Sequence, residues 1–291
     1  MRIRFGWLEM MSRRIPFLAF IAMGGAASTL ALTPPSTLSE EDKQALLDLH
    51  NEMRSQVAAG ALAGQPGASD MEHLLWDDGL AAVATDYASM CIWAHNSNRE
   101  ADLLVNASRS RIDLSNWTYR DVGENIFATT VASPTIQTLL GGVDLWFDEN
   151  GDYTFGTVQG TESCTPGEQC GHYTQIVWAN TRFLGCGFST CSGLVGWPQG
   201  RTFLVCNYSP AGNFIGEAPY APSGAPCSAC SADRASACSD SLCSGCDFAD
   251  PLGCVEVPVP EPTFSLQMLV ALVTVACLRV GRRVGPARTR I

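Results

Sequence analysis

Apolar residues near the start of the chain recur at steps of three and four positions. Leu46, Leu49, Met53 and Val57 share this spacing, which places them on one face of a helix. Ser39 precedes the pattern as a candidate N-cap, and three acidic residues at positions 40–42 favour the positive end of the helix dipole. Residues 60–69 are rich in Gly and Ala. The pattern therefore predicts a helix from about residue 40 to residue 59.

Two further segments have the same helical periodicity. One starts at Trp76-Asp-Asp-Gly, where Asp77 or Asp78 would cap it, and its apolar side comprises Leu80, Val83, Ala84, Tyr87, Ala88 and Cys91. The other follows Ser133-Pro134, with apolar positions at Leu139, Val143, Trp146 and Phe147. We expect both segments to pack one face against a core.

The second half of the domain has a different composition. Residues 173–178 and 202–208 are rich in Val, Ile, Phe, Thr and Tyr, which favours strands. Residues 96–122 are polar and predict an irregular connection. Because helices precede strands, we expect one α+β domain over residues 40–220, which is long enough to bury a core.

Both ends of the chain resemble targeting segments. Residues 1–31 combine arginines, a short apolar run and small residues, as a secretory signal peptide does, with cleavage expected between Ala27 and Ala31. Residues 257–291 contain Pro-Glu-Pro, an apolar run and five arginines, and resemble the PEP-CTERM sorting tail of Gram-negative bacteria. That resemblance implies a bacterial source and processing by an exosortase at the membrane, and a permanent membrane anchor is the alternative.

Charge and cysteine content describe the segment between these ends. Residues 32–278, between the two arginine-rich ends, hold nine basic and 28 acidic residues, a formal charge of −19, which argues against binding to nucleic acid. Twelve of the 13 cysteines lie between residues 91 and 254, and an even set in an exported chain predicts disulfides. We therefore expect an exported protein, located outside the cell or at the cell surface.

The cysteines fall into two groups. Six should cross-link the domain, with a local bridge expected near Cys186 and Cys191, although the pairing is open: Cys91, Cys164, Cys170, Cys186, Cys191 and Cys206. The other six lie in residues 221–256, which we expect to form a disulfide-rich spacer with little apolar core. Zinc thiolates in its two Cys-x2-Cys pairs are the alternative to disulfides.

Several motifs together resemble the CAP superfamily of cysteine-rich secretory, antigen-5 and pathogenesis-related proteins. Residues 171–178 read Gly-His-Tyr-Thr-Gln-Ile-Val-Trp, and residues 206–213 read Cys-Asn-Tyr-Ser-Pro-Ala-Gly-Asn. Cys91-x3-His95, Gly123-Glu-Asn-Ile and Trp146-x2-Glu149 add to the resemblance. It implies a three-layer α-β-α sandwich, the CAP (SCP) fold, with three or four helices around a short antiparallel sheet. It also implies a central cavity formed by His95, Glu124, Glu149 and His172.

Two imidazoles facing two carboxylates suit a divalent metal, such as Zn²⁺, or a general acid/base set. The resemblance implies that His95 and His172 hold the metal. His50, on the first predicted helix, is interpreted instead as a packed, hydrogen-bonded residue. If the site has chemistry, the same four residues would carry a metal- or glutamate-assisted hydrolysis.

We expect binding rather than an established reaction, because no Gly-x-Ser-x-Gly elbow or paired nucleophile and base occurs in the sequence. The expected ligand is a small lipid, glycan or peptide. Aromatic residues would wall its groove, although Trp146 and Trp178 are more typical of core positions: Trp146, Phe147, Tyr153, Tyr173 and Trp178. A purely structural surface protein is the third hypothesis.

Overall fold

The computed structural model describes residues 37–112, 122–158, 164–231 and 237–245. The expected signal peptide and sorting tail lie outside these residues, so both stay predictions, and Cys246 and Cys254 lie outside them as well. Within the described segments, no helix combines the length and the apolar character needed to cross a membrane.

A four-stranded sheet in the order β1-β3-β4-β2 forms the middle of the domain. The strands are β1 (Leu75–Trp76), β2 (Gly123–Thr129), β3 (Phe183–Thr190) and β4 (Thr202–Ser209). β4 pairs antiparallel with both β2 and β3, whereas the short β1 pairs parallel with β3. The strand predicted at residues 202–208 is thus confirmed as the central β4.

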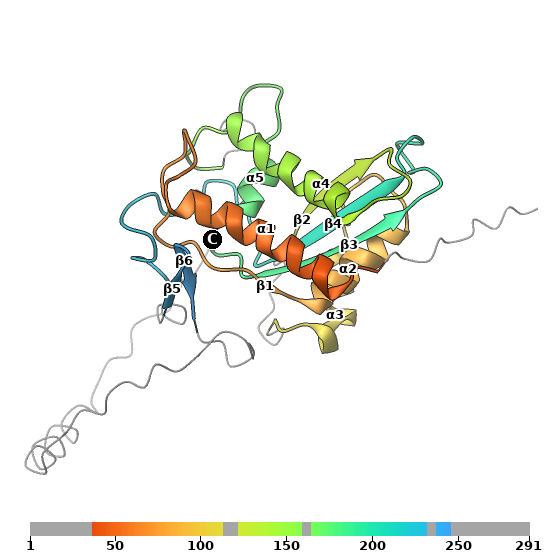
Figure 1. Cartoon of the computed structure of the whole chain (residues 1–291), viewed down its shortest axis with the longest axis horizontal. Coiled ribbons are helices and arrows are strands. Elements are labelled where there is room, and N and C mark those ends of the chain that lie inside the picture. Colours follow the sequence, from red (N-terminus) through yellow and green to blue (C-terminus); the bar gives the residue numbers. More distant parts are fainter. Residues whose placement is uncertain (1–36, 113–121, 159–163, 232–236, 246–291) are drawn as a thin grey trace, which may run out of the picture.

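Helices cover both faces of this sheet. On one face lie α1 (Glu40–Ala58), α4 (Ile136–Asp148) and the short α5 (Gly171–Ile176), and on the other lies α2 (Asp78–Ser89), as Figure 1 shows. Side chains alternate along β4: Leu204 and Tyr208 belong to the cluster with α1 and α4, while Phe203 and Val205 pack with α2. Every residue of β4 is therefore buried. The predicted three-layer α-β-α sandwich is confirmed.

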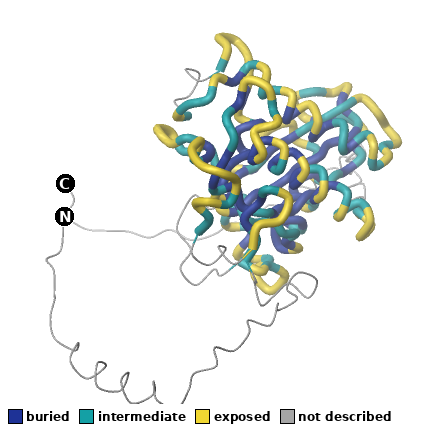
Figure 2. The backbone as a smooth tube through the Cα atoms, turned by 60° about the vertical axis from the view of Figure 1, so that its left-hand side comes forward, coloured by how far each residue is buried: buried dark blue, intermediate teal, exposed yellow. Residues whose placement is uncertain are grey.

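The remaining elements lie at the periphery. They are α3 (Arg99–Val105), the 3-10 turns η1 (Ala107–Arg109) and η3 (Glu149–Gly151), and a hairpin of β5 (Ala237–Ser239) and β6 (Leu242–Ser244). Buried residues concentrate in the interior elements and exposed ones in the outer loops (Figure 2). The hairpin still contacts the domain, because the backbone N–H of Cys243 donates to the carbonyl of Met71 at 2.8 Å.

The predicted helix starts are confirmed by their caps. The Ser39 hydroxyl accepts from the backbone N–H of Asp42, and the Asp42 carboxylate accepts from the backbone N–H of Ser39, which is a capping box. Asp77 caps α2 by accepting from the backbone N–H of Leu80 at 2.7 Å. Local side-chain chemistry thus defines where α1 and α2 begin.

Two predictions of local structure are wrong. Residues 173–178 were expected to form a strand, but α5 occupies Gly171–Ile176. Residues 96–122 were expected to be irregular, but Arg99–Val105 form α3. In the first segment tertiary contacts override local propensity, whereas the second contains strong helix formers that the polar composition concealed.

Disulfides join the six domain cysteines as Cys91–Cys191, Cys164–Cys170 and Cys186–Cys206. Cys186 and Cys191 are both bridged, though not to each other, and Cys186 lies directly opposite Cys206 on the neighbouring strand. In the spacer, Cys227 pairs with Cys238 and Cys230 with Cys243. Three spacer sulfurs lie close enough together to suggest a metal site, but their disulfide bonds leave no thiolate to bind zinc.

Arg54 of α1 is completely buried. Its guanidinium donates hydrogen bonds to five backbone carbonyls: those of Glu72, Ile176, Trp178, Ala179 and Thr181. These carbonyls belong to the end of α5, the turn that follows it and the segment before β1. One planar side chain therefore joins three segments that are distant in sequence.

Replacing Arg54 should strongly destabilise the fold. In Arg54→Met the carbonyls lose their donors inside the protein, so we expect the free energy of unfolding to fall by about 3 kcal/mol or more. Urea denaturation measures this loss. The matched control is Arg109→Met, because Arg109 is exposed, and it should change stability by less than about 0.5 kcal/mol. Similar losses in both variants would contradict the role of Arg54.

His50 is the second buried polar residue of α1. Its Nδ1–H donates to the carbonyl of Leu46 at 2.7 Å, and its Nε2 accepts from the hydroxyl of Tyr208 at 3.0 Å. Burial lowers the pKa of His50 from 6.5 to about 4, so the ring is neutral at pH 7. The prediction of a packed, hydrogen-bonded histidine is confirmed.

This pKa makes stability depend on pH. Between pH 6.5 and 4 the unfolded chain binds a proton at His50 and the folded chain does not, so stability falls as the pH falls through this window. The loss should approach about 3 kcal/mol. His50→Gln cannot titrate, so the stability difference between the wild type and this variant should shrink by that amount from pH 7 to pH 4. Parallel pH profiles in urea denaturation would refute the assignment.

Candidate functional site

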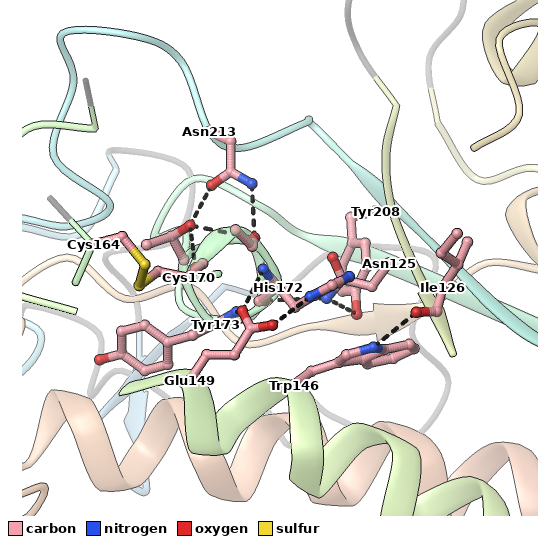
Figure 3. Close-up of polar contacts among 12 residues, drawn as sticks. Asn125, Ile126, Trp146, Glu149, Cys164, Cys170, His172, Tyr173, Tyr208 and Asn213 are labelled. Atoms are coloured by element: carbon pink, nitrogen blue, oxygen red, sulfur yellow. Dashed lines mark hydrogen bonds and ion pairs between the residues drawn. A yellow bond between two sulfur atoms is a disulfide. The ribbon is translucent and has the colours of Figure 1, made fainter. Parts of the chain in front are cut away.

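Glu149 at the end of α4 explains why residues 171–176 are helical. One carboxylate oxygen accepts from the backbone N–H groups of His172 and Tyr173, at 3.0 and 3.2 Å (Figure 3). These two groups belong to the first turn of α5 and have no partner within the helix. A side chain 23 residues away thus caps this helix. The Thr174 hydroxyl also donates to the carbonyl of Cys170, at 3.0 Å.

The other oxygen of Glu149 orients the His172 ring. The distance from His172 Nδ1 to Glu149 Oε1 is 2.6 Å, and the ring stacks on Trp146 with 5.9 Å between centroids. Figure 3 shows Glu149 and Trp146 on the α4 side of the imidazole. Because Nδ1 donates to the carboxylate, Nε2 carries a lone pair, and no hydrogen bond joins it to a described residue.

His95 and Glu124 form a second pair of the same kind. His95 follows α2 in an exposed loop, and its Nδ1 lies 2.9 Å from Oε1 of Glu124 on β2. That oxygen also accepts from the backbone N–H of Asn96 at 2.9 Å. The Glu124 side chain is only 1% exposed, and its Oε2 has no hydrogen-bond partner. The two glutamates therefore differ, because Glu149 uses both oxygens and Glu124 uses one.

A chain of buried hydrogen bonds connects this site to the core. Tyr208 donates to His50, and the Asn125 amide donates to the Tyr208 oxygen at 3.3 Å and to the His172 carbonyl at 3.1 Å. Burial raises the pKa of Tyr208, so its hydroxyl keeps its proton. Sequence reasoning missed Asn125 and Tyr208 as positioning residues. The available signal was their place inside the Gly-Glu-Asn-Ile and Cys-Asn-Tyr motifs.

The turn after β4 completes the frame around α5. Asn213 accepts from the Thr174 hydroxyl at 2.6 Å and donates to the Gly171 carbonyl at 2.8 Å (Figure 3). Gln175 accepts from the backbone N–H of Gly212 at 3.0 Å and packs against Gly123, where a Cβ would lie 2.1 Å from its Oε1. The two signature segments, residues 171–178 and 206–213, therefore bind each other directly.

A cavity of about 450 Å³ opens at this site. Three of the four predicted residues line it, namely His95, Glu124 and His172, while Glu149 lies behind His172 as its partner. Of the five aromatic residues expected to wall the groove, only Tyr153 lines this cavity. Trp146 and Trp178 are core residues, as their positions favoured, and Phe147 and Tyr173 are core residues as well, so the predicted groove wall is wrong for Phe147 and Tyr173.

The sequence matches the family model "CAP: Cysteine-rich secretory protein family" over residues 47–208. The fold, the paired histidines and glutamates, and this match agree, and the chain belongs to the CAP family. Its disulfides and its membership of a secretory family indicate an extracellular protein.

Curated relatives give the same assignment. The chain is 37% identical over 213 residues to peptidase inhibitor 15-A of Danio rerio, covering 71% of each protein. It is 38% identical over 214 residues to peptidase inhibitor 16 of Mus musculus, covering 73% of this chain and 36% of the mouse protein. The chain thus spans about a third of the mouse relative. These relatives are vertebrate proteins, which conflicts with the predicted bacterial source and does not support the sorting tail or a membrane anchor.

Two solved structures share the fold. A crystal structure of NaASP2 with Zn²⁺ matches with a TM-score of 0.56 and 29% identity, over 72% of this chain and 99% of that one. A crystal structure of Na-ASP-1 gives a TM-score of 0.57 and 29% identity, over 74% of this chain and 50% of that one.

Removing the Glu149 carboxylate should loosen α5 and its histidine together. In Glu149→Ala two backbone N–H groups and His172 Nδ1 lose their acceptor, so we expect a loss of about 2 kcal/mol in urea denaturation. The stacking of His172 on Trp146 should also weaken and change the tryptophan fluorescence. Asp148→Ala, at the exposed neighbouring position, should change neither measurement. If the two variants behave alike, Glu149 does not hold α5.

Proposed function

We propose that this protein is an extracellular ligand-binding domain whose cavity binds a divalent cation through His95 and His172. The observation that carries the proposal is that both histidine rings make the same hydrogen bond, from Nδ1 to a glutamate. Each Nδ1 donates to a buried or half-buried glutamate, which leaves each Nε2 lone pair available as a ligand. In zinc sites, a histidine that binds the metal commonly donates its other ring N–H to a carboxylate.

The donor chemistry at the cavity fits zinc. Imidazole nitrogen and carboxylate oxygen are both zinc ligands, and Glu124 Oε2 is a buried acceptor without a partner. His95 and His172 would supply two nitrogen ligands and leave the other coordination positions open, and a bound ion would then act there as a Lewis acid toward a ligand. The related NaASP2 has been crystallised with Zn²⁺, which supports the choice of probe.

The glutamates have separate roles in this proposal. Glu149 orients His172 and caps α5, so it has no oxygen left for a ligand. Glu124 orients His95 with one oxygen and keeps the other, so it is the carboxylate that would contact a ligand or accept a proton. Hydrolysis, the second hypothesis from the sequence, would therefore depend on Glu124 as the base.

Zinc titration of the full chain, produced in an oxidising compartment, tests the proposal. Isothermal titration calorimetry at pH 7 should detect one site, and His95→Ala or His172→Ala should each weaken it at least tenfold, because each removes one nitrogen ligand. The double variant should abolish it.

His73→Ala is the matched control, because His73 lies outside the cavity lining, and it should bind zinc as the wild type does. Zinc that survives in the double variant would place the metal elsewhere. If the wild type binds no zinc, the site is not a zinc site, as a purely structural protein would require.

A further inference from the structure

The cavity at the two histidines continues into a second hollow. A space of about 820 Å³ beside it shares His95, Glu124 and Asn213 with the first. The second hollow lies between the start of α3, the start of β2 and residues 211–217. A metal ion needs only its immediate ligands, so a groove of this combined size suits an extended ligand.

Most donors in this groove are already used. Arg99 donates to the carbonyls of Val122 and Asn96, at 2.6 and 2.8 Å. The Asn213 amide donates to the carbonyl of Gly171, at 2.8 Å. The Gln175 amide donates to the hydroxyl of Thr181, at 3.3 Å. These contacts hold the walls of the groove and leave few donors for a ligand.

Apart from the exposed amide of Gln169, the remaining polar side chains among the described lining residues are acceptors. Glu168 and Glu217 are exposed, and their carboxylates make no hydrogen bond or ion pair with the described residues. Glu100 has only a loose ion pair with Arg99 at 3.9 Å. Glu124 lies where the two hollows meet, but its side chain is only 1% exposed, so its carboxylate is held within the wall. Both histidines also present Nε2 lone pairs.

We infer that this groove binds an extended peptide segment that carries lysine or arginine side chains. The inference rests on the proposed ligand-binding function and specifies its ligand. Among the described residues that line the groove, the carboxylates of Glu100, Glu168 and Glu217 face one arginine, Arg99, so a cationic ligand would gain charge-assisted hydrogen bonds and an anionic one would be repelled. The exposed carboxylates of Glu168 and Glu217 would accept from an ammonium or guanidinium group of the ligand.

Apolar residues at both ends of the groove favour a peptide over a simple polyamine. Tyr153 and Val158 line the end beside His172, and Phe214 and Ile215 line the other end. The Ile215 side chain is 82% exposed, so a ligand could cover it. A peptide offers apolar and cationic side chains in alternation, whereas a polyamine offers only charge and methylene groups.

A random peptide library displayed against the immobilised full chain tests this inference. The selection is made in EDTA, so the result does not depend on zinc, and failure of the metal proposal is scored separately by calorimetry. The enriched peptides should carry lysine or arginine beside apolar residues. Because the whole protein is acidic, cationic peptides could be attracted to any part of its surface. A control variant with the same change in charge distinguishes this attraction from binding in the groove.

The test variant is Glu168→Gln with Glu217→Gln, and the control is Glu52→Gln with Asp148→Asn. Both pairs remove two exposed carboxylates, but only the first pair lies in the groove. The affinity of a selected peptide, measured by fluorescence anisotropy at 150 mM salt, should fall about fivefold or more in the test variant and not in the control.

Equal losses in test and control variants would show general attraction to an acidic surface and would overturn the inference. So would enrichment of neutral or acidic peptides, absence of enrichment, or binding of spermine as tightly as the selected peptide.

Discussion

The buried guanidinium of Arg54 is the interaction on which the rest of the site depends. Its donors satisfy carbonyls of Ile176 and Trp178 at the end of α5, where the helix itself provides no partner. It also bonds the carbonyl of Glu72, just before β1. The short helix α5 is therefore fixed at its end by α1 and at its start by Glu149 of α4. A six-residue helix has little stability alone, so His172 is only as well placed as these two contacts allow.

Each histidine of the site donates a hydrogen bond from Nδ1 to a glutamate, but the two glutamates differ in their other contacts. Glu149 is saturated by His172 and the start of α5, so its role is to position. Glu124 keeps a buried oxygen without a partner, which is costly unless something binds there. The two similar pairs therefore differ in the hydrogen bonds that each glutamate makes with the described residues.

The groove and the whole molecule share one electrostatic character. Most donors in its walls bond to other groups of the protein, and the acceptors face the groove. A metal ion and a cationic side chain could therefore both bind these acceptors. A positive ion on the histidines would repel a cationic peptide nearby, so the two ligands would oppose each other where they meet. The disulfides require an oxidising compartment to form. They stabilise the domain by cross-linking its backbone and do not depend on a larger core.

Periodicity and caps in the sequence determined α1, α2, α4 and β4, because those elements rest on local spacing and on side chains near their own ends. The motifs also predicted the residues that form the two histidine–glutamate pairs, His95 with Glu124 and His172 with Glu149. Tertiary structure alone decided that residues 171–176 are helical, because their β-branched composition favours a strand and their cap comes from Glu149 on another element. It likewise decided the cysteine pairing and the single free oxygen of Glu124, since both depend on distances between segments that no local pattern encodes.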